Sequence, residues 1–242
     1  MDWLVAVAMA QGLNLSVVGG AVRDRLLGES TPDKDLDLVV EGEGRWPAIQ
    51  LLEVIEKQAL PAGFQLTQSQ SFEAFGTAHL QLDTPAGRLL CDLSSARSER
   101  YAFPGAHPEV QPTDLPGDLK RLDFSINAIA EQLPLGSSPL IDPFAGEADL
   151  KAGQLKLLHP LSLQDDPSRL LRGVRYGARL GLQLAPETAG QVESTLAAWP
   201  WSWHIGDPPE QAPPALATRL RMELELFLFR EPWPQAFDLL QA

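Results

Sequence analysis

"VVGGAVRDRLLGESTPDKDLDLVV", residues 17–40, places a strand, a glycine turn, a short helix and a second strand in direct succession. Apolar residues recur with helical spacing after the turn, and Gly28 can end that helix. The segment DLDLVVEG then predicts a strand that Gly42 closes. Asp35 and Asp37 are two residues apart on this strand, so their carboxylates point to the same side. This pattern fits either a solvated acidic face or a site for a cation such as Mg²⁺.

The turn itself, Gly19-Gly20, also has two interpretations. A strand, two glycines and a helix N-terminus bring backbone N–H groups and a partial positive charge to one point, where a phosphate can approach closely. A tight turn without a ligand explains the same pattern. Arg23 and Asp24 can likewise form a local ion pair.

Composition indicates an ordinary globular chain. The 242 residues suffice for one large domain or two ordinary ones, and they are 44% hydrophobic and 21% charged. The apolar runs are too short to cross a membrane, and no basic N-terminal region precedes an apolar one as in a signal peptide. The single cysteine, Cys91, cannot form an intrachain disulfide. We therefore expect a cytoplasmic protein with no membrane partner.

The net charge is −13, from 19 basic and 32 acidic residues. Proteins that grip long nucleic acids non-specifically usually carry an electropositive surface, so this balance argues against such binding. It still allows a local basic cleft. The basic residues gather in two windows, which contain Arg97, Arg100, Lys120, Arg121, Arg169, Arg172, Arg175 and Arg179.

The first part of the chain predicts a mixed α/β domain. Helices are expected over 4–13, 21–28 and 46–60, and strands over 15–18, 35–42, 64–68, 75–83 and 87–96, the last two as a hairpin. From Tyr101 to Gly117 the proline-rich sequence shows neither helical nor strand periodicity, so a long loop is expected. Phe124–Ala130 reads as an apolar helix, followed by a strand and turn around LIDPFAG.

After residue 160 the chain predicts helices. DPSRLLRGVRYGARLGL has a strong helical period, with Pro167 placed to start the helix and Gly181 to end it. Two further helical stretches, ETAGQVESTLAAW and ALATRLRMELELFLF, flank a segment rich in proline and tryptophan, in which residues 199–203 are a candidate exposed contact.

A third carboxylate, Asp92, lies in the later strand LLCDLSS and can approach the aspartate pair if that strand is adjacent. Arg97 follows it, and Arg121 precedes Asp123. Guanidinium groups suit polyphosphate oxygens because they present a fixed fork of donors, although each can equally form a surface ion pair. Together these features suggest a metal–triphosphate site for two-metal nucleotidyl transfer. No P-loop signature occurs.

Several ordered motifs resemble those of class II tRNA nucleotidyltransferases and bacterial poly(A) polymerases, members of the polymerase β superfamily. They are GGAVRD with DLDLVVEG, CDLSSARSERY, DLKRLDFSINAIA, IDPFAGEADLKAGQL, DDPSRLLRGVRYGARLG and RLRMELELFL. The resemblance extends from Gly19 to Leu228. It implies an α/β (α+β) nucleotidyltransferase head with a small mixed sheet over 1–160, followed by an all-α neck over 161–242.

The resemblance also implies roles for individual residues. Asp35 and Asp37 would hold the metals, with Asp92 as a further catalytic carboxylate. The triphosphate and sugar would be bound by Gly19, Gly20, Arg23, Arg97, Arg121, Asp123 and Asn127, the last two near the ribose. Asp166 and Arg169 would read the edge of the base, and Arg172 would support them. For Arg175 and Arg179 we expect a solvated helix face instead.

Three positions depart from the family pattern. Leu122 replaces the second arginine of its RRD motif, where Lys120 can compensate; Ser125 replaces a threonine; Asp165 replaces a glutamate. The family also usually continues into larger helical domains that hold the tRNA, whereas this sequence ends at Ala242, as a fragment or a short paralogue would.

The resemblance implies an Mg²⁺-dependent enzyme that adds CMP, AMP or both from CTP and ATP to the 3′ end of RNA, with tRNA as the expected acceptor. Poly(A) synthesis is the alternative within the family. A catalytically weakened, truncated paralogue that binds nucleotide or RNA is the alternative outside catalysis. The oligomeric state stays open.

Overall fold

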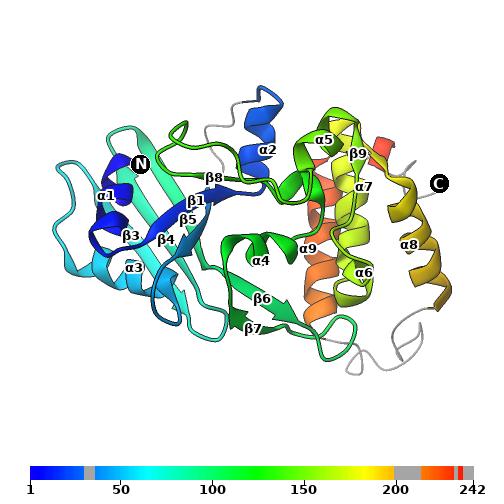
Figure 1. The fold of residues 1–242 in the computed structure, drawn as a ribbon, viewed down its shortest axis with the longest axis horizontal. Coiled ribbons are helices and arrows are strands. Elements are labelled where there is room, and N and C mark those ends of the chain that lie inside the picture. Colours follow the sequence, from blue (N-terminus) through cyan, green and yellow to red (C-terminus); the bar gives the residue numbers. More distant parts are fainter. Residues whose placement is uncertain (30–35, 199–213, 232–233, 237–242) are drawn as a thin grey trace. The chain divides into compact units, whose positions relative to one another are not determined.

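The computed structural model describes residues 1–29, 36–198, 214–231 and 234–236 (Figure 1). The chain forms two compact units: unit 1 contains Met1–Ser98, Val110–Leu122 and Asn127–Phe144, and unit 2 contains Glu99–Glu109, Asp123–Ile126 and Ala145–Ala242. The chain thus alternates between the units, and residues 145–160 pack in unit 2. The predicted head–neck division near residue 160 stays a prediction.

Unit 1 is built on a six-stranded mixed sheet with the order β3-β4-β5-β2-β1-β8. Its strands are β1 (Asn14–Val18), β2 (Leu36–Glu41), β3 (Gln65–Phe72), β4 (Thr77–Thr84), β5 (Gly87–Ser95) and β8 (Ala130–Gln132). Strands β2 and β5 run parallel, and the other neighbours are antiparallel. The expected mixed α/β class and the β4–β5 hairpin are confirmed.

Helices α1 (Asp2–Ala10) and α3 (Pro47–Lys57) pack on one face of this sheet (Figure 1). Strand side chains alternate between faces, so one face can be apolar while the other is polar. Leu38, Leu80 and Leu93 are all almost fully buried in the core beneath the two helices. Residues one position away along these strands therefore point to the opposite face.

The predicted long loop over Tyr101–Gly117 is wrong in its second half. There β7 (Glu109–Pro112) pairs with β6 (Arg97–Arg100), and α4 (Leu115–Lys120) begins. The Asp114 side chain accepts a hydrogen bond of 2.9 Å from the Gly117 backbone N–H and caps this helix. An aspartate followed by a first-turn proline is a helix-start signal, but the helix is too short to show a period.

The predicted helix over Phe124–Ala130 is also wrong. Only one helical turn forms, η1 (Ser125–Asn127), and Ala130 already belongs to β8 at the edge of the sheet. Phe124, Ile126 and Ile129 are each at most 1% exposed. A short run that is buried on every side carries no period that distinguishes helix from strand.

Unit 2 is mainly helical. Its helices are α5 (Gly146–Lys151), α6 (Ser162–Asp165), α7 (Ser168–Leu180), α8 (Pro186–Ala198) and α9 (Pro214–Arg230), with a small parallel pair, β9 (Gln154–Leu155) and β10 (Gln183–Leu184). The ends predicted for α7 are confirmed: Pro167 is its N-cap and Gly181 its C-cap, in the left-handed region with φ of 67°. The tryptophan-rich stretch 199–203 lies outside the described residues.

The prediction of a solvated face for Arg175 is wrong. Its side chain is 8% exposed and forms ion pairs with Glu223 and, at 3.0 Å, with Glu231. Arg179 lies 3.5 Å from Glu231 and is partly exposed. These ion pairs connect α7 with α9 and the residue that follows it.

Arg175→Ala is expected to lower the free energy of unfolding by about 3 kcal/mol, since it leaves two buried carboxylates without this partner. Urea denaturation followed by circular dichroism measures the change. Arg221→Ala is the control, because Arg221 is 73% exposed and only 3.7 Å from the exposed Glu225; it should change stability little. Equal, small effects of both substitutions would contradict the buried ion-pair account.

Candidate active site

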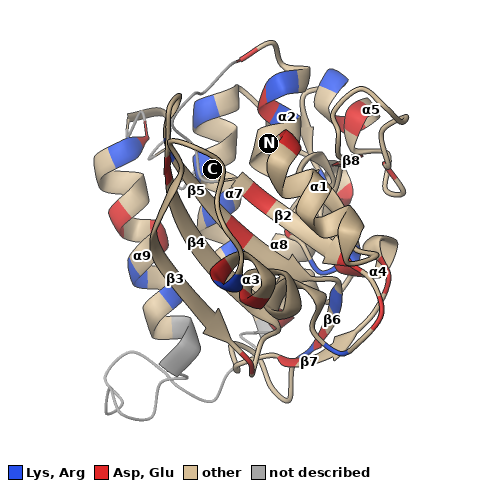
Figure 2. Cartoon of the chain, turned by 90° about the vertical axis from the view of Figure 1, so that its left-hand side faces the viewer, with Lys and Arg blue, Asp and Glu red and all other residues tan. Residues whose placement is uncertain are grey.

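Three polar side chains form a row across the middle of the unit 1 sheet. Asp37 on β2 lies opposite Asp92 on β5, and Asp92 lies opposite His79 on β4. Residues in register on neighbouring strands point to the same face and are about 5 Å apart. This row is therefore on the face opposite α1 and α3, and Figure 2 colours the acidic residues of the sheet red. The strand of Asp92 is adjacent to that of Asp37, so the condition for Asp92 to approach the aspartate pair is met.

The carboxylates of this row are accessible to solvent. Asp37 is exposed, and the Asp92 side chain is 50% exposed. His79 Nδ1 lies 2.6 Å from Asp92 Oδ1, so the imidazole fixes one oxygen of that carboxylate. Asp35 lies outside the described residues, and its pairing with Asp37 stays a prediction.

The glycine turn lies directly beside Asp37. Gly19, the N-cap of α2 (Gly20–Leu26), has φ of 73°, a conformation that favours glycine. A Cβ at Gly19 would be 3.8 Å from Asp37 Oδ2. The backbone of the turn and the carboxylate of Asp37 are thus brought together, as the predicted metal–triphosphate site requires.

Arg23 is buried, and the local ion pair considered for it is present. Its guanidinium lies 2.6 Å from Asp24 Oδ1, and its Nη1 donates a hydrogen bond of 2.6 Å to Asn127 Oδ1. Arg23 is 2% exposed and Asn127 is 5% exposed. Both residues therefore support the turn from inside unit 1, and their direct contact with a nucleotide stays a prediction.

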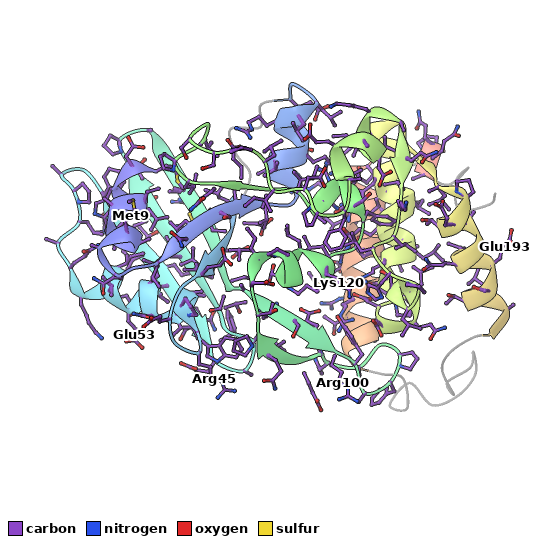
Figure 3. All side chains as sticks on the ribbon, viewed as in Figure 1. Met9, Arg45, Glu53, Arg100, Lys120 and Glu193 are labelled. Atoms are coloured by element: carbon purple, nitrogen blue, oxygen red, sulfur yellow. The ribbon has the colours of Figure 1, made fainter. Side chains whose placement is uncertain are left out.

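Arg97 and Arg121, both predicted to bind phosphates, contact one buried carboxylate, Arg97 through its backbone and Arg121 through its guanidinium. Asp118 is fully buried. It accepts hydrogen bonds from the Arg97 backbone N–H at 3.0 Å, from Arg121 Nε at 2.9 Å and from Arg121 Nη2 at 3.2 Å. The two-point contact fixes the plane of the Arg121 guanidinium. Lys120, next to it, is exposed at the end of α4 (Figure 3).

The predicted base-reading residues lie in unit 2, at the start of α7. Asp166 is 7% exposed, and its Oδ1 accepts hydrogen bonds from the Ser168 backbone N–H at 3.1 Å and from Ser168 Oγ at 2.6 Å. Arg169 is 5% exposed and donates to Ser162 Oγ at 2.5 Å. Both predicted side chains are thus held in defined positions.

Arg172, predicted to support this pair, connects the predicted ribose-side residue with α9. It lies 3.2 Å from Asp123 Oδ2 and 3.1 Å from Glu223 Oε1. Burial alone would lower the pKa of the Arg172 guanidinium, but the negative charges of Asp123 and Glu223 raise it above its usual value. The group is therefore permanently charged.

The pKa of Asp165, which replaces the family glutamate, is also raised. Burial is the main cause, and the attraction of Arg169 acts in the opposite direction. The carboxylates of Asp166 and Glu99 add to the increase.

Residues 15–156, more than half of the chain, match the family model described as the Poly A polymerase head domain. The chain belongs to this family.

Curated members of this family with similar sequences are tRNA nucleotidyltransferases. The A-adding enzyme of Halalkalibacterium halodurans is 41% identical over 187 residues, which are 77% of this chain and 40% of that protein. The CC-adding enzyme of Deinococcus radiodurans is 41% identical over 198 residues, which are 81% of this chain and 49% of that protein. The chain spans half or less of the length of these relatives.

Solved structures of the family agree with the fold. A CCA-adding enzyme in an apo form superposes with a TM-score of 0.74 at 30% identity, over 98% of this chain and 50% of that one. A tRNA nucleotidyltransferase complexed with a primer tRNA and an incoming ATP analog gives a TM-score of 0.72 at 31% identity, over 98% of this chain and 59% of that one.

Nucleotidyltransferases of this family generally use a divalent metal ion. Asp37 and Asp92 fit such an ion, because they offer exposed carboxylate oxygens on neighbouring strands beside the glycine turn. Within the described residues, no group of three or more potential ligands is arranged to hold a metal. Mg²⁺ commonly takes only one or two carboxylates and completes its coordination with waters and substrate phosphates, so two suffice.

Three residues that hold the predicted site residues in place had no role in the sequence-based prediction. Asp118 holds Arg121, Glu223 holds Arg172, and Arg219 lies against Asp166. The three-residue spacing of Asp118 and Arg121 is a helical pairing that the sequence could have suggested. The contacts of α9 with α7 join residues about fifty positions apart and leave no local signal.

None of the described helices is both long and apolar enough to cross a membrane.

Proposed function

We propose that this chain transfers CMP, AMP or both from CTP and ATP to the 3′ end of RNA, with tRNA as the acceptor. The observation that carries the proposal is the position of Asp37 and Asp92 in register beside the Gly19 turn, in a member of this family. Exposed carboxylates next to a glycine turn can serve a metal and a triphosphate at the same place.

In the proposed reaction the 3′ oxygen of the RNA bonds to the α-phosphorus while the bond between the α- and β-phosphates breaks, and pyrophosphate leaves. Asp37, with Asp35 beside it in sequence, would hold Mg²⁺, and Asp92 would assist. When bound, Mg²⁺ favours deprotonation of the 3′ hydroxyl and offsets the charge that develops on the leaving pyrophosphate. His79 keeps Asp92 oriented through its hydrogen bond.

The triphosphate would be bound by the chain's own backbone and guanidinium groups. The amides of Gly19 and Gly20 can approach it closely, and Arg97 and Arg121 can supply positive charge. Asp118 fixes the orientation of Arg121 before the nucleotide arrives, which reduces the entropy lost on binding.

We further propose that Asp166 and Arg169 select the base. The Asp166 carboxylate can accept a hydrogen bond from the exocyclic amine that cytosine and adenine share, and Arg169 can donate to ring acceptors. Uracil and guanine carry a carbonyl oxygen at the corresponding position, which a carboxylate repels. Arg172 supports the pair, with Asp123 and Asn127 toward the ribose.

The same fold is compatible with two alternative functions: a poly(A) polymerase, and a nucleotide-binding paralogue without transferase activity. Leu122, in place of an arginine, is the residue that favours the second. An exposed Asp37 in register with Asp92 favours catalysis. Because the substrate we propose is tRNA, we propose the cytoplasm as the compartment.

A panel of acceptors tests the proposal. It contains tRNA transcripts that end before the terminal CCA, after its two cytidines, or with the mature end, together with an oligo(A) primer. With Mg²⁺ and labelled CTP or ATP, we expect extension of at least one incomplete tRNA and none of the mature tRNA. Extension of oligo(A) in preference to the tRNAs would replace the proposal with poly(A) synthesis.

A further inference from the structure

Arg219 on α9 contacts unit 2 at three points around the proposed base-reading site. Its Nη1 lies 3.2 Å from Asp166 Oδ2, and its Nη2 donates a hydrogen bond of 2.9 Å to the Ala106 carbonyl oxygen. Its guanidinium carbon lies 5.9 Å from the centre of the Tyr101 ring. The side chain is 21% exposed, so these contacts hold it largely inside the unit. Ala106 and Tyr101 fix Arg219, and Arg219 in turn faces Asp166.

The two oxygens of Asp166 have different partners. Oδ1 accepts both hydrogen bonds from Ser168, whereas Oδ2 faces Arg219. Arg219 Nη1 is buried and forms no hydrogen bond with the described part of the chain, although it is close to Oδ2. The attraction between Arg219 and Asp166 is therefore Coulombic rather than a directed hydrogen bond.

The Asp166 carboxylate is buried and depends on the positive charge of Arg219. Asp166 is 7% exposed, and a buried carboxylate is stable only with a nearby positive charge or hydrogen bonds. Arg219 supplies that charge without directing an N–H at Oδ2. Oδ2 is thus held in place and can accept a hydrogen bond from an exocyclic amine.

We propose that Arg219 is a positioning residue that sets base selectivity by holding the Asp166 carboxylate in its orientation. The inference rests on the proposed function, in which Asp166 reads the base. It adds that selectivity depends on α9, through a residue far in sequence from Asp166 and Arg169.

The test measures the equilibrium affinity for CTP against UTP, and for ATP against GTP, in the presence of Mg²⁺. Each ratio is taken on one preparation, so the folded fraction of a variant cancels. Arg219→Gln should lower the selectivity for the amino-bearing nucleotide by about fivefold. Arg219→Lys, which keeps the charge, should retain most of the selectivity.

The matched control is Arg221→Gln. Arg221 lies two residues further along α9, is 73% exposed and pairs only loosely with Glu225. It should leave both ratios unchanged. A merely structural role for Arg219 would weaken all four nucleotides equally, and unchanged ratios in Arg219→Gln would overturn the proposal.

A double variant separates this inference from the proposed function. If Arg219 acts through Asp166, then Arg219→Gln adds no further loss of selectivity to Asp166→Asn. Additive losses would overturn the inference while the proposed function stands. If Asp166→Asn leaves the ratios unchanged, base reading by Asp166 fails, and the inference fails with it.

Discussion

Replacement of Asp37 by asparagine is expected to reduce nucleotide transfer by about a thousandfold or more, the scale of effects at metal-assisted catalytic sites. Asp37 is exposed, lies in register with Asp92 and is next to the Gly19 turn. Asparagine keeps the shape of the side chain but removes the charge that attracts a divalent cation. Steady-state extension of a tRNA primer measures the loss.

The same variant should bind Mn²⁺ less tightly, as electron paramagnetic resonance of the free ion can show without any turnover. Asp83→Asn is the matched control, because Asp83 also lies in a strand of the sheet but pairs with Arg88 at 3.1 Å on the surface. It should leave both transfer and Mn²⁺ binding unchanged. Normal transfer by Asp37→Asn would show that the metal assignment is wrong.

The second large effect is expected at Asp166. Asp166→Asn should reduce discrimination of CTP from UTP, or of ATP from GTP, by about tenfold to a hundredfold. A carboxylate only accepts hydrogen bonds, whereas an asparagine amide can present either a donor or an acceptor to the base. Competition between paired nucleotides in primer extension measures the ratio.

Loss of selectivity should exceed any loss of triphosphate affinity in this variant, because Asp166 is proposed to contact the base and the glycine turn is proposed to contact the triphosphate. Glu193→Gln on α8 is a suitable control, since Glu193 is exposed in the same unit (Figure 3). An equal loss for all four nucleotides would mean that Asp166 supports the fold instead of reading the base.

Much of the fold is predictable from local signals. Pro167 and Gly181 mark both ends of α7, and the alternation in β4 and β5 predicts their hairpin. The helix expected over 124–130 fails for a physical reason: its residues are buried on all sides, so tertiary packing rather than an amphipathic period decides their conformation.

Some residues of the candidate site are likewise predictable from local sequence, and others are not. Asp37 and Asp92 are recognisable because each interrupts an apolar strand, and the sheet register places them together. Arg175 was not predictable as buried, because its partners Glu223 and Glu231 are 48 and 56 positions away in sequence. The role inferred for Arg219 likewise depends on packing that no short motif contains.

We propose above all that this chain forms a phosphodiester bond at an RNA 3′ end. The most direct measurement combines the wild-type chain, Mg²⁺, labelled CTP and ATP, and a tRNA transcript without its terminal CCA, and counts both the nucleotides added and the pyrophosphate released. We predict extension by C, by A or by both, with one pyrophosphate per nucleotide and complete loss on chelation of the metal. Nucleotide binding without extension of any RNA primer would contradict the claim and identify the chain as a non-catalytic nucleotide-binding paralogue.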